Sequence, residues 1–145
     1  MSSHRIGVFL AICVTLALTL AACGAAKPPE SCGVGGTAND TLFARHFALM
    51  ELVNKATGLP GAEDPEAGAA FTLGDLLAIR VNALGEVSVR TCVEGRSGGK
   101  IALDQTVTAE QGERLLPLAS FPKGDYVVRV IMDGALIKNL PFAVK

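Results

Sequence analysis

The chain of 145 residues contains no tryptophan, one tyrosine and two histidines. This shortage of aromatic rings leaves little surface on which sugars or bases could stack. No C-x-x-C pair is present, and His46 is the only histidine after His4. Because Ser-His-Asp catalysis needs a histidine beside its serine, the sequence does not predict a hydrolase of that type. We expect a protein that is not an enzyme and has no cofactor.

Clustered charge of one sign is also missing. The chain has 13 Lys and Arg residues against 14 Asp and Glu residues, a formal net charge of −1. Nucleic acid binds to groups of cations, so we expect no nucleic-acid partner. Residues 95–100 are glycine-rich but lack the spacing of a phosphate loop, and we predict a hairpin tip there. Glu63, Asp64 and Glu66 lie close together in a segment with Gly and Pro, where we expect them to be solvated.

The N-terminus contains an apolar run that is too short to span a membrane. His4 and Arg5 precede about 15 residues (6–20), fewer than the roughly 20 that a transmembrane helix needs. The run ends in Leu20-Ala21-Ala22-Cys23, which resembles the lipobox of bacterial lipoprotein signal peptides. The resemblance implies cleavage before Cys23 and acyl chains on it, which would tether the protein to a membrane. An uncleaved anchor and an ordinary secretory signal are the alternatives.

The resemblance also implies a location and a division of the chain. Gly24 stands where an aspartate would mark retention in the inner membrane, so the periplasmic face of an outer membrane is expected. We divide the chain into a signal peptide (1–22), a tether (23–38), a helix with a loop (39–70) and a sandwich domain (71–145). The Gly, Ala and Pro content of residues 24–38 predicts a flexible spacer.

Residues 39–57 predict a helix, because apolar side chains recur there at helical spacing. These are Leu42, Phe43, Phe47, Met50 and Val53. Asp40 is the expected N-cap, and Gly58 and Pro60 are expected to end the element. Residues 58–70 show no periodicity, so we expect a surface loop.

From Phe71 onward the apolar period changes to two, which is typical of an antiparallel β-sandwich or barrel. Strands are expected at 77–83, 86–94, 101–107, 114–119, 126–132 and 135–144. Asp133-Gly134 predicts a type I′ hairpin turn between the last two, since both positions need positive φ angles. Pro141 lacks an amide hydrogen, so the last strand is expected at a sheet edge or with a bulge. The sequence therefore predicts an all-β fold.

Two segments carry a resemblance to bacterial immunoglobulin-like domains. Pro122-Lys123-Gly124-Asp125-Tyr126-Val127-Val128-Arg129-Val130 is similar to their penultimate strand, and Leu140-Pro141-Phe142-Ala143-Val144 to their last. The resemblance implies an immunoglobulin-like sandwich with a binding or spacing role. It also places Tyr126 at a tyrosine corner, where the hydroxyl bonds back to the preceding turn.

Four cysteines are present, of which Cys13 lies in the predicted leader and Cys23 in the lipobox. The remaining pair, Cys32 and Cys92, predicts a disulfide in an oxidising compartment. Alternation places Cys92 on the strand face opposite Val87, Val89 and Val93, where an N-terminal segment could cross it. Two unbonded thiols, or a metal or redox role, are the alternatives.

The functional expectation is a lipid-anchored, non-catalytic module that binds an envelope protein or serves a structural role. The edge near Pro141 and the helix that starts at Asn39 are its candidate surfaces. The alternative is a periplasmic small-ligand or copper carrier. It would use Cys32, His46 and Met50 as thiolate, imidazole and thioether ligands.

Overall fold

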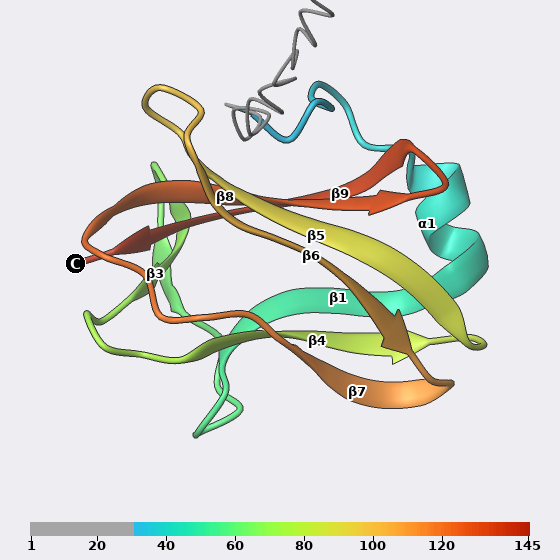
Figure 1. Ribbon diagram of the computed structural model, residues 1–145. Coiled ribbons are helices and arrows are strands. Elements are labelled where there is room, and N and C mark those ends of the chain that lie inside the picture. Colours follow the sequence, from blue (N-terminus) through green and yellow to red (C-terminus); the bar gives the residue numbers. More distant parts are fainter. Residues whose placement is uncertain (1–30) are drawn as a thin grey trace, which may run out of the picture.

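The computed structural model describes residues 31–145. The predicted signal peptide, Cys23 and residues 24–30 lie outside the described residues. In the described part, one short helix is followed by strands that form two packed sheets (Figure 1). The elements are α1 (Asp40–His46), β1 (Phe47–Asn54), β2 (Ala62–Asp64), β3 (Gly68–Phe71), β4 (Leu77–Ala83), β5 (Val87–Gly95), β6 (Ile101–Ala109), β7 (Gly112–Pro117), β8 (Gly124–Met132) and β9 (Ala135–Val144). The fold is an all-β sandwich, as the sequence predicts.

The two sheets differ in size. A three-stranded sheet has the order β1-β4-β7, and a six-stranded sheet has the order β2-β3-β9-β8-β5-β6 (Figure 1). The chain changes sheet five times: between β1 and β2, β3 and β4, β4 and β5, β6 and β7, and β7 and β8. This is the order of the B, C, E, F and G strands of immunoglobulin-like sandwiches. The described pairs are antiparallel except β3 with β9, which is parallel.

The main core lies between the sheets and is built by alternation. Leu77, Ile79 and Val81 of β4 are each 0% exposed, and Val89 and Val93 of β5 face them from the other sheet at 1% and 0%. Burying a side chain of this size stabilises a fold by roughly 1.5–3 kcal/mol. Two predicted strands, 77–83 and 135–144, coincide with β4 and β9, and the other four differ at their ends by one or two residues. The predicted period of two is therefore confirmed.

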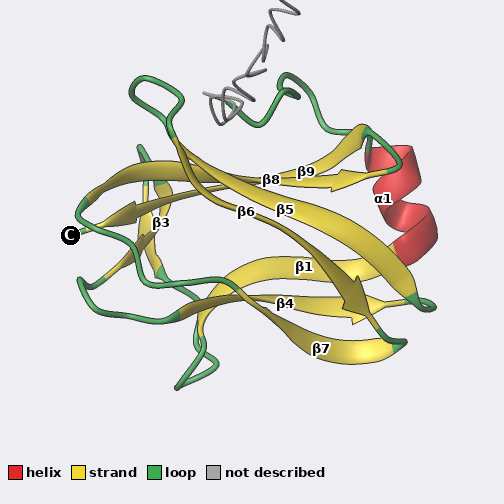
Figure 2. Cartoon of the chain, in the orientation of Figure 1, coloured by secondary structure: helices red, strands yellow, loops and turns green. Residues whose placement is uncertain are grey.

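The helix predicted over residues 39–57 is wrong beyond His46. Helix α1 ends there, and Phe47–Asn54 forms β1 (Figure 2). A register shift between Phe47 and Leu49 inserts one extra residue, so Phe47 and Met50 both face the core although they are three positions apart. The β-bulge therefore gives the buried residues of this strand the spacing that is typical of a helix. The N-cap is also different: the Asn39 side chain, not Asp40, accepts a hydrogen bond from the Leu42 amide at 2.9 Å.

Residues 58–70 are not only a surface loop, as the sequence suggested. They contain β2 and β3, and β3 lies beside β9 with Ala69 opposite Phe142. Strand β3 pairs with β9 only at residues 142–144, so Pro141 lies in the part of β9 whose single strand neighbour is β8, which agrees with the edge position expected for it. The other expectation was a bulge, and β9 has one near Ile137, where the register with β8 shifts. Pro141 itself is exposed, and Gly68 at the start of β3 lies against its ring.

Candidate functional site

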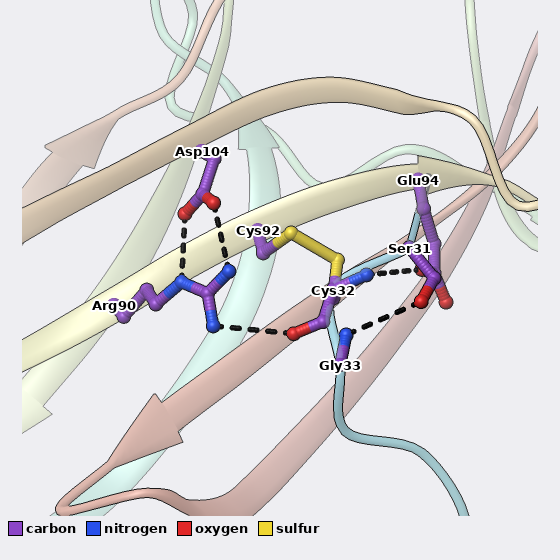
Figure 3. Close-up of polar contacts among 7 residues, drawn as sticks. All are labelled: Ser31, Cys32, Gly33, Arg90, Cys92, Glu94 and Asp104. Atoms are coloured by element: carbon purple, nitrogen blue, oxygen red, sulfur yellow. Dashed lines mark hydrogen bonds and ion pairs between the residues drawn. A yellow bond between two sulfur atoms is a disulfide. The ribbon is translucent and has the colours of Figure 1, made fainter. Parts of the chain in front are cut away.

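The N-terminal segment, defined as residues 31–39, is fixed on the outer face of the six-stranded sheet. Cys32 and Cys92 form a disulfide with a Cα–Cα distance of 5.8 Å (Figure 3). The predicted disulfide is confirmed. Cys92 points away from the main core and joins a second small apolar cluster with Cys32, Ile131 and Leu136. Because the segment covers this face, Cys92 is 0% exposed and Cys32 is 1% exposed.

Two charged side chains hold the backbone of Cys32 from either side. The Cys32 amide donates to Glu94 Oε2 at 2.9 Å, and Arg90 Nη1 donates to the Cys32 carbonyl oxygen at 3.1 Å (Figure 3). Arg90 in turn makes a bidentate pair with Asp104, at 2.8 and 2.7 Å. We call the disulfide together with Arg90 and Glu94 the clamp. It satisfies both backbone polar groups of Cys32, which burial would otherwise leave without water.

The hydrogen bonds from Arg90 lower the pKa of Asp104 and, in return, raise the pKa of Arg90. Hydrogen bonding to a charged form favours that form, and partial burial opposes it. Both groups therefore stay charged across the physiological pH range, and Arg90 keeps its position beneath the segment.

A second set of contacts extends the attachment toward α1. Arg129 donates to Glu94 Oε1 and to Asn139 Oδ1, each at 2.9 Å. Asn139 Nδ2 donates to the carbonyl oxygen of Gly36 at 3.0 Å, and the Asn39 amide donates to the carbonyl oxygen of Leu136 at 2.8 Å. The flexible spacer predicted for residues 24–38 is thus wrong for the part from Ser31 to Ala38. Distant side chains and the disulfide order this segment despite its glycines.

Sequence reasoning gave no role to four members of this attachment: Arg90, Glu94, Arg129 and Asn139. Glu94 shares the outward face of β5 with Arg90 and Cys92, and that alternation was the available signal. Its ion-pair partner Arg129 is 35 positions away and belongs to a different strand. Strand order is needed to bring them together.

No protein-family model matches the chain, and no curated protein matches it. The described part contains no helix long and apolar enough to cross a bilayer. Cys23 and its lipobox lie outside that part.

The residues of the proposed copper site lie in different surroundings. The sulfur of Cys32 is bonded to Cys92, Met50 is packed in the main core, and His46 ends α1. The disulfide leaves Cys32 without the thiolate that this hypothesis requires. Among residues 31–145, no group of three or more His, Cys, Asp or Glu side chains is placed to hold a metal ion.

Tyr126 lies near the start of β8, after the connection from β7. Its hydroxyl donates to the carbonyl oxygen of Pro122 at 2.8 Å, the backward bond expected of a tyrosine corner. Its ring stacks on Phe142 with 5.2 Å between centroids and meets Phe121 at 5.4 Å. The corner therefore ties the crossing between sheets to the core.

Two turns match their predicted conformations. Asp133 and Gly134 have φ angles of 50° and 77° between β8 and β9, as a type I′ turn requires. Residues 95–100 form the tip between β5 and β6, where the Gly95 amide donates to the Lys100 carbonyl oxygen at 2.9 Å. Arg96 holds this tip against the body by donating to the carbonyl oxygens of Glu66 and Asp125.

The acidic cluster is only partly solvated, contrary to the sequence expectation. Glu63 and Glu66 are exposed, but the Asp64 side chain is 11% exposed and forms an ion pair with Lys145. Asp64 also accepts the amide hydrogens of Glu66 and Ala67, at 3.0 and 2.9 Å. The hydrogen bond from Lys145, and then these two, lower the pKa of Asp64 to about 2. Asp64 therefore holds the β2–β3 turn against the end of the chain.

Proposed function

We propose that the protein is a lipoprotein of the bacterial cell envelope, anchored by acyl chains on Cys23. Its sandwich acts as a non-catalytic module that binds an envelope protein or serves a structural role. The observation that carries this proposal is the buried disulfide between Cys32 and Cys92. Structural disulfides form and persist outside the reducing cytosol, which agrees with the export implied by the lipobox.

The position of the clamp gives the anchor a defined reach. Only residues 24–31 separate Cys23 from Cys32, and from Cys32 onward the chain lies on the sheet. Nine virtual Cα–Cα steps extend at most about 30 Å. A lipid on Cys23 would hold the six-stranded side of the sandwich within that distance of the membrane surface. This spacing suits a module that acts beside its membrane.

The charged side chains of the clamp bind the backbone of the N-terminal segment, which supports a structural role for them. Arg90 and Glu94 bind the carbonyl oxygen and the amide of Cys32, and Arg129 outside the clamp donates to Glu94. Each is already committed to ordering the N-terminal segment. We therefore assign the clamp to attachment of the anchor segment, and Gly24 after the lipobox cysteine favours the periplasmic face of an outer membrane.

The anchor is tested by Cys23→Ser, with Cys13→Ser as the matched control. Cys23→Ser removes the acylated sulfur, so the protein is expected to move from the membrane fraction to the soluble fraction or to keep its leader. Cys13→Ser changes a cysteine of the predicted leader and should leave fractionation unchanged. Mass spectrometry of the wild-type protein should find two or more acyl chains on residue 23. An unmodified Cys23 in the membrane-bound protein would contradict the proposal.

A further inference from the structure

The strand edges of the described residues differ in how well they are protected. The sheets end at β1, β7, β2 and β6. Strand β2 has three residues, two of them acidic, and β7 carries a glutamate, an arginine and Pro117. The free side of β1 is bridged by Pro60 opposite Val53. Short length, charge, proline and a covering loop are the devices that prevent strands from pairing with other chains.

Strand β6 has none of these protections along most of its length. It contains nine residues, Ile101–Ala109, without proline, lysine or arginine. Its single charge, Asp104, is held by Arg90 of the neighbouring strand through the bidentate pair. A register shift against β5 occurs at Ala102, and from Leu103 to Ala109 the pairing is regular. Seven consecutive residues thus form an edge with which no other described strand pairs, while the Gln105 side chain donates to the carbonyl oxygen of Pro117 in β7 at 2.6 Å.

We propose that this edge binds a second copy of the chain, with the two β6 strands antiparallel about a two-fold axis at Gln105. In this register Leu103 lies opposite Val107 of the second copy, on the face toward the core. Asp104 lies opposite Thr106, on the solvent face. Apolar side chains face apolar ones, and no like charges are opposed, so the edge is complementary to itself.

Neighbouring two-fold registers are less favourable. An axis at Asp104 would set two carboxylates directly opposite each other, which destabilises strand pairing. An axis at Thr106 would set Gln105 against Val107. The sequence of β6 therefore selects Gln105 as the centre among these registers.

This inference identifies a second copy of the chain as the partner of the binding module, and to that extent it rests on the proposed function. Strand pairing alone buries less area than a standard protein interface, so the contact is weak between freely diffusing copies. Anchoring on a common membrane raises the local concentration of copies and favours pairing. The decisive experiment is therefore made on the full chain in its membrane.

Gln105→Cys places a thiol on the proposed axis. Opposed Cα atoms in an antiparallel pair are about 4.5–5.5 Å apart, within the range that a disulfide spans. Mild oxidation of the membranes should convert this variant to a covalent dimer. The matched control is Thr108→Cys, which is more exposed than position 105. Its two copies would lie six residues apart along the strands, about 20 Å, so it should not cross-link.

A charge variant tests the register. Thr106→Asp sets a carboxylate opposite Asp104 of the second copy, whereas Thr106→Asn keeps the same shape as that aspartate without the charge. In the Gln105→Cys background, we expect about tenfold less covalent dimer with Thr106→Asp than with Thr106→Asn. Both substitutions are on the solvent face, so the monomer fold is retained in each, which circular dichroism checks.

The outcomes separate this inference from the anchor. Equal cross-linking at positions 105 and 108, or none at either in membranes that contain the protein, overturns the pairing and leaves the anchor intact. A covalent adduct at position 105 with the mass of a different protein also overturns it. A specific dimer from a protein that fractionates as soluble, with Cys23 intact, would keep the pairing and reject the anchor.

Discussion

The strongest quantitative expectation concerns the Cys32–Cys92 disulfide. The two cysteines are 60 positions apart, and the chain-entropy relation for a closed loop of this size gives about 4 kcal/mol at 25 °C. Domains of this size have free energies of unfolding of about 5–15 kcal/mol. Cys92→Ala should therefore remove a large fraction of the stability of the oxidised protein.

The measurement is urea unfolding of the wild type and Cys92→Ala, each in an oxidised and a reduced form. Because both sulfurs are buried, the wild type is reduced while unfolded and then refolded with the reductant present. We expect a difference of about 4 kcal/mol between the oxidised forms and a much smaller one between the reduced forms. Only the oxidised wild type has its unfolded chain restricted by the cross-link.

Leu136→Ala is the control, because Leu136 is 7% exposed in the same small cluster but is not cross-linked. It should lower the free energy of unfolding by about 2–5 kcal/mol, and by the same amount in both redox forms. If Cys92→Ala behaved like this control, the cysteine would act through packing alone. The role assigned to the cross-link would then be refuted.

Two further predictions use other features of the fold. Among residues 31–145 the Thr91 hydroxyl is fully buried without a hydrogen-bond partner. Thr91→Val removes this hydroxyl and should raise the free energy of unfolding by about 1–2 kcal/mol, whereas Thr91→Ser should lower it. Denaturant unfolding measures both variants. The pKa of Asp64 is lowered from 3.8 to about 2, so its contribution is complete above pH 4 and is lost as the pH falls toward 2. The stability difference between the wild type and Asp64→Asn should therefore shrink over that interval, and a constant difference would contradict the role of the Lys145 pair.

Alternation made much of the sandwich predictable from the sequence. Leu77, Ile79 and Val81 repeat at a spacing of two and are buried as that spacing requires. The same reasoning placed Cys92 on the outer face of β5, which is why its bond to Cys32 could be anticipated. The turn at Asp133-Gly134 was also predictable from the sequence, since few residue pairs accept two positive φ angles.

The helix was mispredicted because a bulge changes the apparent period. One extra residue between Phe47 and Leu49 lets side chains three positions apart face the same side of β1. Val53 then continues the false period, because it is also buried at a position that Pro60 bridges. A pattern within one segment cannot distinguish a helix from a bulged strand that is covered on both faces.

The N-terminal segment shows a different limit, because what orders it is not in the segment. Its glycines and alanines predict flexibility, yet the backbone of Cys32 bonds to side chains 58 and 62 positions away, and that of Gly36 to one 103 positions away. Only the strand order β9-β8-β5 assembles those side chains on one surface. The consequence for function is a shorter connection to Cys23 than composition suggests. Of the sixteen residues of predicted tether (23–38), those from Ser31 onward are fixed on the sheet, so in the anchoring that we propose the clamp would set the distance between the sandwich and the membrane.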